Sequence, residues 1–214
     1  MKAAHDDALF PRIGLGVLEH LERQHGAPAE GAPGRVVLVS STRSGEGKSF
    51  VAQGLASALA EQQDGDVIWV DAAFDRPSAD TDISRRGAAG LSEIMTLGSL
   101  QGLAPAGLGP ERLWRLGRGV LAQPALLQRP DAVGKGLTAL RAGFALVVLD
   151  APSLDGCGAL LAETDACVMV VDSRRTSRRA ARQALADAKL GPERLAGLVL
   201  NHRPRPIPRW LGGD

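Results

Sequence analysis

The sequence predicts an α/β fold in which a mostly parallel β-sheet is flanked by helices on both faces. Five short apolar runs rich in valine recur along the chain, and runs that are apolar on both faces are typical of parallel strands covered by helices. Helical patterns alternate with these runs, as a β-α succession requires. The expected strands span 35–40, 66–71, 144–150, 166–172 and 197–201, and the helices that separate them span 48–63, 130–142 and 176–189.

The composition is that of one folded domain with short appendages. The chain has 214 residues, of which 44% are hydrophobic and 23% charged, and its formal net charge is +1. These values are ordinary for a globular protein and give no general argument for binding to nucleic acid or membranes. No apolar run approaches the roughly 18 residues of a membrane span, and the polar amino terminus does not resemble a secretory signal, so we expect a cytoplasmic protein. Cys157 and Cys167 lack metal-ligand spacing and are expected to be buried, reduced thiols.

Three segments are expected along the chain: an amino-terminal helix with a linker, a main domain, and a basic, proline-rich tail. Their bounds are 1–34, 35–201 and 202–214. The helix of the first segment is expected over 12–24 and the linker, rich in Gly, Ala and Pro, over 26–34. Thr176 is expected to cap the helix that follows it. The stretch 98–129 is punctuated by Gly and Pro, and its pattern favours neither helix nor strand.

The segment SSTRSGEGKSF (40–50) follows one expected strand and opens one expected helix, which is the context of a phosphate-binding loop, or P-loop. Gly45 and Gly47 allow the backbone to wrap closely, so that its N–H groups face phosphate oxygens. Lys48 is expected to neutralise the β- and γ-phosphates of ATP, and the Ser49 hydroxyl to bind Mg²⁺. Thr42 stands where the strict pattern has its first glycine, and an ordinary glycine-rich β-α turn is the alternative. The expected nucleotide contacts are Arg43, Ser44, Gly45, Glu46, Gly47, Lys48, Ser49 and Phe50.

Two aspartates end expected strands, Asp71 after DVIWV and Asp150 after FALVVL. Ligands of open α/β sheets collect at the carboxyl ends of the strands, so both carboxylates are expected beside the phosphate loop. We expect Asp71 and Asp150 to be metal ligands with Ser49, and to be catalytic groups with Lys48. The alternative is that each aspartate caps a loop.

Together these motifs resemble the cytoplasmic kinase domain of the bacterial tyrosine kinase (BY-kinase) family, a group of P-loop NTPases. SSTRSGEGKS resembles the Walker A stretch of that family, VIWVDAAFDRP its second acidic motif, and FALVVLDAPS its Walker B strand. GLSEIM (90–95), DACVMVVDSRRTS (165–177) and GLVLN (197–201) match further landmarks. The resemblance covers about 35–201 and implies that Asn201 contacts the adenine base, although a structural turn residue is the alternative there.

The chain departs from the family pattern in ways that bear on function. Ala73 stands where the second acidic motif has its second aspartate, and Asp75 stands where that motif has its arginine. The chain contains no tyrosine, so self-phosphorylation on tyrosine is excluded. The Glu-x-x-Arg-x-x-Arg pattern linked to ring assembly is not evident near the amino end. Arg43 occupies the place of the signature lysine of partition and division-site ATPases, which argues against close membership of that sister group.

The resemblance implies an ATP-binding regulator of exopolysaccharide or capsule synthesis or export. Such a protein would bind ATP or ADP with Mg²⁺, hydrolyse ATP slowly, and dock on the cytoplasmic part of an inner-membrane polysaccharide co-polymerase. It would thus be peripheral to the inner membrane, and a homo-oligomer stays open. Two alternatives also stay open: an active ATPase or protein kinase that phosphorylates another protein, and a positioning ATPase related to the partition and division-site ATPases.

The carboxyl end is basic, with ten Arg or Lys against three Asp or Glu from Arg174 onward. A solvated helix face is one explanation of this charge. A docking surface for the anionic inner leaflet or for an acidic cytoplasmic tail is the other. Aromatic residues do not alternate with these charges apart from Trp210, so we do not expect nucleic-acid binding.

Overall fold

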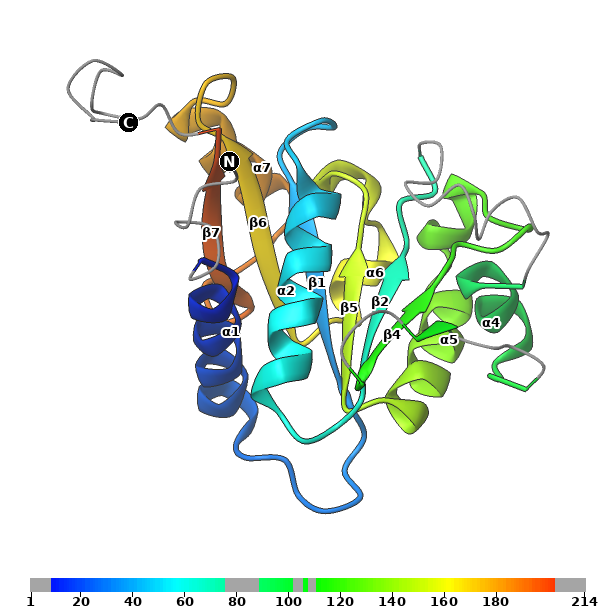
Figure 1. The fold of residues 1–214 in the computed structure, drawn as a ribbon. Helices are drawn as coiled ribbons and strands as arrows, with labels where there is room; N and C mark the ends of the chain where they lie inside the picture. Colours follow the sequence, from blue (N-terminus) through cyan, green and yellow to red (C-terminus); the bar gives the residue numbers. More distant parts are fainter. Residues whose placement is uncertain (1–8, 76–88, 102–105, 108–110, 203–214) are drawn as a thin grey trace, which may run out of the picture.

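The computed structural model describes residues 9–75, 89–101, 106–107 and 111–202, and these form a sheet covered by helices on both faces (Figure 1). The α-helices are α1 (Leu9–His25), α2 (Lys48–Gln62), α4 (Leu91–Leu97), α5 (Pro130–Gly143), α6 (Ala159–Ala162) and α7 (Arg178–Asp187). The strands are β1 (Arg35–Ser41), β2 (Val67–Asp71), β3 (Ala106–Gly107), β4 (Leu113–Leu116), β5 (Leu146–Asp150), β6 (Ala166–Asp172) and β7 (Leu195–Asn201). Two short 3-10 helices, η1 (Pro124–Gln128) and η2 (Leu154–Gly156), complete the described part.

The seven strands lie in the order β3-β4-β2-β5-β1-β6-β7. All neighbouring pairs are parallel except β3 and β4, which are antiparallel. The expected α/β fold with a mostly parallel sheet is therefore confirmed. β1 lies between β5 and β6, so the loop that follows it opens at the carboxyl edge near the middle of the sheet.

Alternate residues of the central strands feed two apolar cores, one on each face of the sheet. Val37 and Val39 of β1 face the core under α1 and α2, whereas Val36 and Leu38 face the core formed with α4, α5 and α6. These side chains are fully buried. Complete burial of one aliphatic side chain contributes about 1.5–3 kcal/mol, so the two-sided valine runs fix both the strands and the layers.

The amino-terminal helix belongs to this core. The sequence predicted a helix over 12–24, and α1 begins three residues earlier, with Pro11 in its first turn where a proline is tolerated. Val17 and Leu21 pack beside α2. The linker 26–34 contains neither helix nor strand and ends at Gly34, where any side chain would collide with the Phe144 carbonyl.

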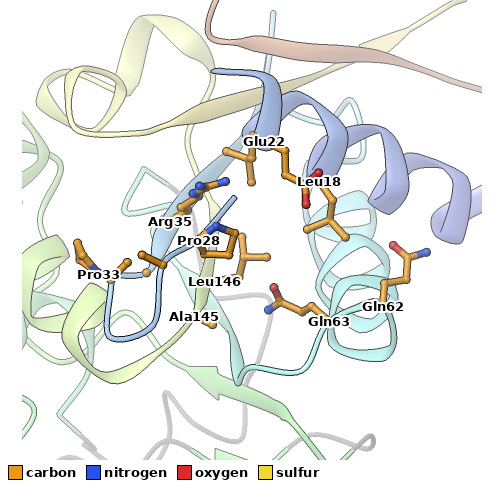
Figure 2. Close-up of a pocket in the computed structure, with 13 residues that line it drawn as sticks. Leu18, Glu22, Pro28, Pro33, Arg35, Gln62, Gln63, Ala145 and Leu146 are labelled. Carbon is orange, nitrogen blue, oxygen red and sulfur yellow. The ribbon is translucent and has the colours of Figure 1, made fainter. Parts of the chain in front are cut away.

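A pocket of about 310 Å³ lies between α1, the linker and the end of α2 (Figure 2). Arg35 and Leu146, the first residues of β1 and β5, line it together with Leu18, Pro28 and Gln62. The pocket therefore opens where the strands begin, at the edge of the sheet opposite to the loop that follows β1.

Three further expectations can be compared with the structure. Ser177 caps α7, because its hydroxyl accepts a hydrogen bond from the Ala180 N–H at 3.1 Å, so the assignment of this cap to Thr176 was wrong. Both cysteines are buried and form no disulfide, as expected, and burial raises the pKa of the Cys157 thiol to about 11. Residues 203–214 of the expected tail lie outside the described part of the chain. Among the described helices, none is both long and apolar enough to span a bilayer.

Candidate nucleotide-binding site

The loop between β1 and α2 has the backbone that the glycine pattern predicted. Gly45 and Gly47 adopt left-handed φ angles of 85° and 93°, which L-residues with a side chain rarely adopt. Gly47 also packs so closely against the Asn201 amide that a Cβ at this position would collide with it. Gly47 is the N-cap of α2 and provides no side-chain hydrogen bond, so nothing from this residue covers the start of the helix. A helix N-terminus of this kind attracts phosphate groups.

A buried carboxylate braces this loop from behind. Glu46 accepts a hydrogen bond from the Arg43 N–H at 2.9 Å through Oε2, and from the Asp172 N–H at 3.1 Å through Oε1. The Thr176 hydroxyl donates to the same Oε1. Glu46 was expected among the nucleotide contacts, and its side chain instead ties the loop to the end of β6. A contact between the Glu46 main chain and the nucleotide stays a prediction.

The first turn of α2 carries the expected cation and hydroxyl. Lys48 is buried at the start of the helix and Ser49 follows it, half-buried. Phe50 is 62% exposed, and its ring packs edge-on against Phe10 of α1 with centroids 5.4 Å apart. The Phe50 side chain therefore contacts the amino-terminal helix, and the contact of Phe50 with the nucleotide stays a prediction.

Residues 41–44, which lead from β1 into the loop, differ in their burial and hydrogen bonds. Arg43 and Ser44 are exposed. The Ser41 hydroxyl donates to the Arg43 carbonyl at 2.6 Å and holds the loop where it leaves β1. Within the described residues, the buried hydroxyl of Thr42 has no hydrogen-bond partner. A buried hydroxyl costs free energy unless a partner satisfies it, and a phosphate oxygen in the loop is one such partner.

The two expected carboxylates lie side by side at the carboxyl edge. Asp71 of β2 is opposite Asp150 of β5 in the strand register, and Asp150 is in turn opposite Val39 of β1. Both carboxylates are buried. The two aspartates thus end adjacent strands, as the sequence predicted, and their role beside Lys48 stays a prediction.

Asp71 makes an ion pair that the sequence did not reveal. Arg118, in the loop after β4, donates from Nη2 to Oδ2 at 2.9 Å and to Oδ1 at 3.1 Å, and from Nε to Oδ2 at 3.3 Å. The Ala73 N–H donates to Oδ1 at 3.1 Å. Both carboxylate oxygens are therefore engaged, and binding of Mg²⁺ by Asp71, which stays a prediction, requires Arg118 to move.

Asn201 lies at the end of β7 and reaches the phosphate loop. Its Nδ2 donates to the Glu46 carbonyl at 2.9 Å, and its Oδ1 accepts from the His202 N–H at 2.9 Å. These bonds correspond to the turn role that was left open for this residue. Contact with an adenine base stays a prediction.

A third strand-end aspartate organises the turn after β6. Asp172 accepts the Arg174 N–H at 2.9 Å and lies 3.0 Å from His202 Nδ1. The backbone N–H of Arg174, and then the hydrogen bond from His202, hold the pKa of Asp172 below its usual value. Asp172 is thus a turn residue, and its main chain meets the phosphate loop through Glu46.

The donor set fits a nucleotide with Mg²⁺. Mg²⁺ prefers oxygen ligands and in phosphate sites takes only one or two carboxylates together with phosphate oxygens and water. The Ser49 hydroxyl and the Asp150 carboxylate are ligands of that kind, and the cradle of Gly45, Gly47 and Lys48 suits the phosphates.

Comparison with known proteins places this arrangement in a structural group. No protein-family profile matches the chain, and no curated protein matches it. Among solved structures, the VpsO kinase domain is 19% identical with a TM-score of 0.68, and the match covers 94% of this chain and all of that domain. The kinase domain of the Escherichia coli tyrosine kinase ETK is 17% identical with a TM-score of 0.66, covering 85% of this chain and 73% of that one.

The chain has a BY-kinase-like fold. A ParA family ATPase from Chlorobium tepidum is also similar, at 21% identity and a TM-score of 0.61 over 81% of this chain and 76% of that one. The expected P-loop NTPase fold is confirmed by these matches. At such identities the likeness is one of fold, so the BY-kinase-like fold locates the site and leaves its activity to the residues present.

Proposed function

We propose that this chain is an ATP-binding, BY-kinase-like regulator of exopolysaccharide or capsule synthesis or export. It acts with the cytoplasmic part of an inner-membrane polysaccharide co-polymerase, to which it is peripheral. The similarity of fold to the VpsO and ETK kinase domains supports the BY-kinase-like part of this proposal, and the resemblance in sequence to that family implies the pathway. The observation that carries nucleotide binding is the loop before α2, in which two left-handed glycines precede the buried Lys48.

Different residues of the site would bind the phosphates and the metal ion. Loop N–H groups and Lys48 hold the phosphates, while Ser49 and Asp150 hold Mg²⁺, which neutralises phosphate charge when bound. Asp150 lies next to the loop because β5 and β1 are paired. This set of residues suffices for binding.

Slow turnover of ATP follows from the acidic residues. Phosphoryl transfer depends on groups that are positioned in advance around the phosphate. Ala73 stands where the second acidic motif has a carboxylate, so one such group is missing from this chain. We therefore propose that nucleotide occupancy, and not rapid hydrolysis, is the signal that the chain passes to its partner. Robust transfer of labelled phosphate to the co-polymerase would favour the protein-kinase alternative.

A positioning ATPase is the second candidate, and the similarity to the ParA family ATPase favours it. Arg43 stands where that group has its signature lysine and argues against it. Light scattering separates the two, since a positioning ATPase should form a dimer that depends on ATP. A particle mass that ATP does not change supports the regulator.

Calorimetry with purified protein tests nucleotide binding. Lys48→Ala should weaken Mg-ATP binding about ten- to a hundredfold, because a hydrogen bond to a charged group contributes about 1.5–3 kcal/mol. Lys135→Ala is the matched control, since Lys135 is exposed on α5 and should leave the affinity unchanged. Equal affinity in all three proteins would refute the site.

The pathway needs a second experiment, in the host cell. Deletion of the chain should reduce surface polysaccharide, the unaltered chain should restore it, and Lys48→Ala should not. Normal polysaccharide in the deletion strain would refute the pathway and leave nucleotide binding untouched.

A further inference from the structure

The ion pair between Asp71 and Arg118 is buried and two-pronged. The Asp71 side chain is 1% exposed and the Arg118 side chain 12%, and the guanidinium meets both carboxylate oxygens. Removing one member of such a pair leaves the other charge buried and uncompensated. We therefore expect each side chain to leave its partner only when another group with the partner's charge takes that place.

The main chain that carries Arg118 is fixed on α4. The Gly117 and Arg118 carbonyls accept the Leu91 and Ser92 N–H groups, both at 2.9 Å. On the other side of Arg118, Glu93 accepts the N–H groups of Val120 at 3.0 Å and Leu121 at 2.9 Å. The backbone is thus held before and after Arg118, so a change of partner needs only the side chain to move.

The strand order directs this side chain toward the nucleotide. Arg118 follows β4, Asp71 ends the adjacent β2, Asp150 ends β5, and the phosphate loop follows β1, which is next in the sheet. Adjacent strands are about 4.8 Å apart, so two spacings, about 10 Å, separate the ends of β2 and β1. The terminal phosphate of ATP, held between Lys48 and the strand-end aspartates, falls in this interval.

We propose that Arg118 is the residue by which this chain distinguishes ATP from ADP. When ATP binds, the guanidinium moves from Asp71 to the γ-phosphate, and the Asp71 carboxylate becomes a ligand for Mg²⁺. The exchange keeps both charges compensated, because the guanidinium fork fits a phosphoryl group as well as a carboxylate. ADP lacks the γ-phosphate and leaves the pair of Arg118 and Asp71 intact.

This inference rests on the proposed nucleotide binding, and it accounts for two properties of Asp71: its burial beside Asp150 and its expected role as a metal ligand. The pair explains how two buried strand-end aspartates coexist without the metal, since Arg118 neutralises one of them. It also gives Asp71 its predicted place as a metal ligand, but only in the ATP complex.

The test compares ATP with ADP, both with Mg²⁺, by calorimetry. The unaltered chain should bind ATP more tightly than ADP. Arg118→Ala should weaken ATP binding about ten- to a hundredfold and change ADP binding less than twofold. Arg118→Lys keeps the charge but not the fork, so its affinity for ATP should fall between that of the unaltered chain and that of Arg118→Ala. It also serves as the test if Arg118→Ala does not fold. Arg112→Ala is the matched control, because Arg112 pairs with the exposed Asp64 and should change neither affinity.

The outcomes separate the two proposals. An unaltered chain that binds neither nucleotide would overturn the proposed function and this inference with it. Binding of both nucleotides that Arg118→Ala weakens equally, or not at all, would overturn the role of Arg118 alone. A merely structural Arg118 would give that equal effect, together with a lower melting temperature.

Discussion

Replacing Glu46 with alanine removes three hydrogen bonds at once from the loop that precedes α2. The bond from the Arg43 N–H is only part-buried, so water can replace its acceptor, but the bond from the Asp172 N–H is buried and this N–H is left without an acceptor. An unsatisfied buried N–H costs about 1–3 kcal/mol, and the lost bond from Thr176 adds about 1 kcal/mol. We therefore expect Glu46→Ala to lower the free energy of unfolding by about 2–4 kcal/mol.

Glu46→Gln is the matched variant, because it keeps the shape and one acceptor oxygen. That oxygen can serve Asp172 and Thr176, while the amide nitrogen would face the Arg43 N–H, donor against donor. The expected loss is about 1 kcal/mol, at most half that of alanine. Urea unfolding followed by tryptophan fluorescence measures both values, and calorimetry should show weaker ATP binding in the same order. Unchanged stability in Glu46→Ala would refute the brace that we assign to this side chain.

Three further outcomes are expected, two at the phosphate loop and the end of β6 and one at the buried cysteines. Gly47→Ala places a side chain at a φ of 93° and should cost roughly 1–2 kcal/mol of stability and weaken ATP binding, both measurable by thermal shift with and without nucleotide. The Arg174 N–H lowers the pKa of Asp172 from 3.8 in the folded chain, so this carboxylate stabilises the fold above about pH 4, and the stabilisation is lost as the pH falls below that value. Asp172→Asn should therefore lose less stability than the unaltered chain when the pH is lowered below about 4, as urea unfolding would measure. Cys157 and Cys167 should resist thiol reagents at pH 8 until urea unfolds the chain, because burial raises the pKa of both thiols; rapid labelling of the folded protein would contradict this.

The sequence predicted five of the seven described strands because their signal is local and redundant, whereas β3 and β4 lie in the stretch 98–129, whose pattern favoured neither helix nor strand. Runs such as those of β1 and β6 are apolar on both faces, and that pattern has few solutions other than a covered parallel strand. The phosphate loop could be predicted equally well, since Gly45, Gly47 and Lys48 lie within four residues and the left-handed backbone of the loop is a property of glycine itself.

The contacts that the sequence did not reveal are long-range. Arg118 meets Asp71 across 47 residues, from a stretch whose pattern favoured neither helix nor strand. The cap of α7 was misassigned because two adjacent hydroxyl residues have the same local propensity; the Thr176 hydroxyl is engaged by Glu46, 130 residues away, and Ser177 is left to cap the helix. Tertiary packing decides these contacts, so they cannot be predicted from a short stretch of sequence.

The packing of α1 on α2 bears on how the protein can be divided. A fragment that begins at Arg35 would retain every residue of the phosphate loop but lose Val17 and Leu21, which cover the α2 face of the core. It would also remove Phe10 from the ring of Phe50, one residue beyond Ser49, for which we propose Mg²⁺ binding. Apolar surface uncovered in this way favours self-association. Expression of a minimal nucleotide-binding unit should therefore start before Leu9, although the motifs alone would place its beginning at the first strand.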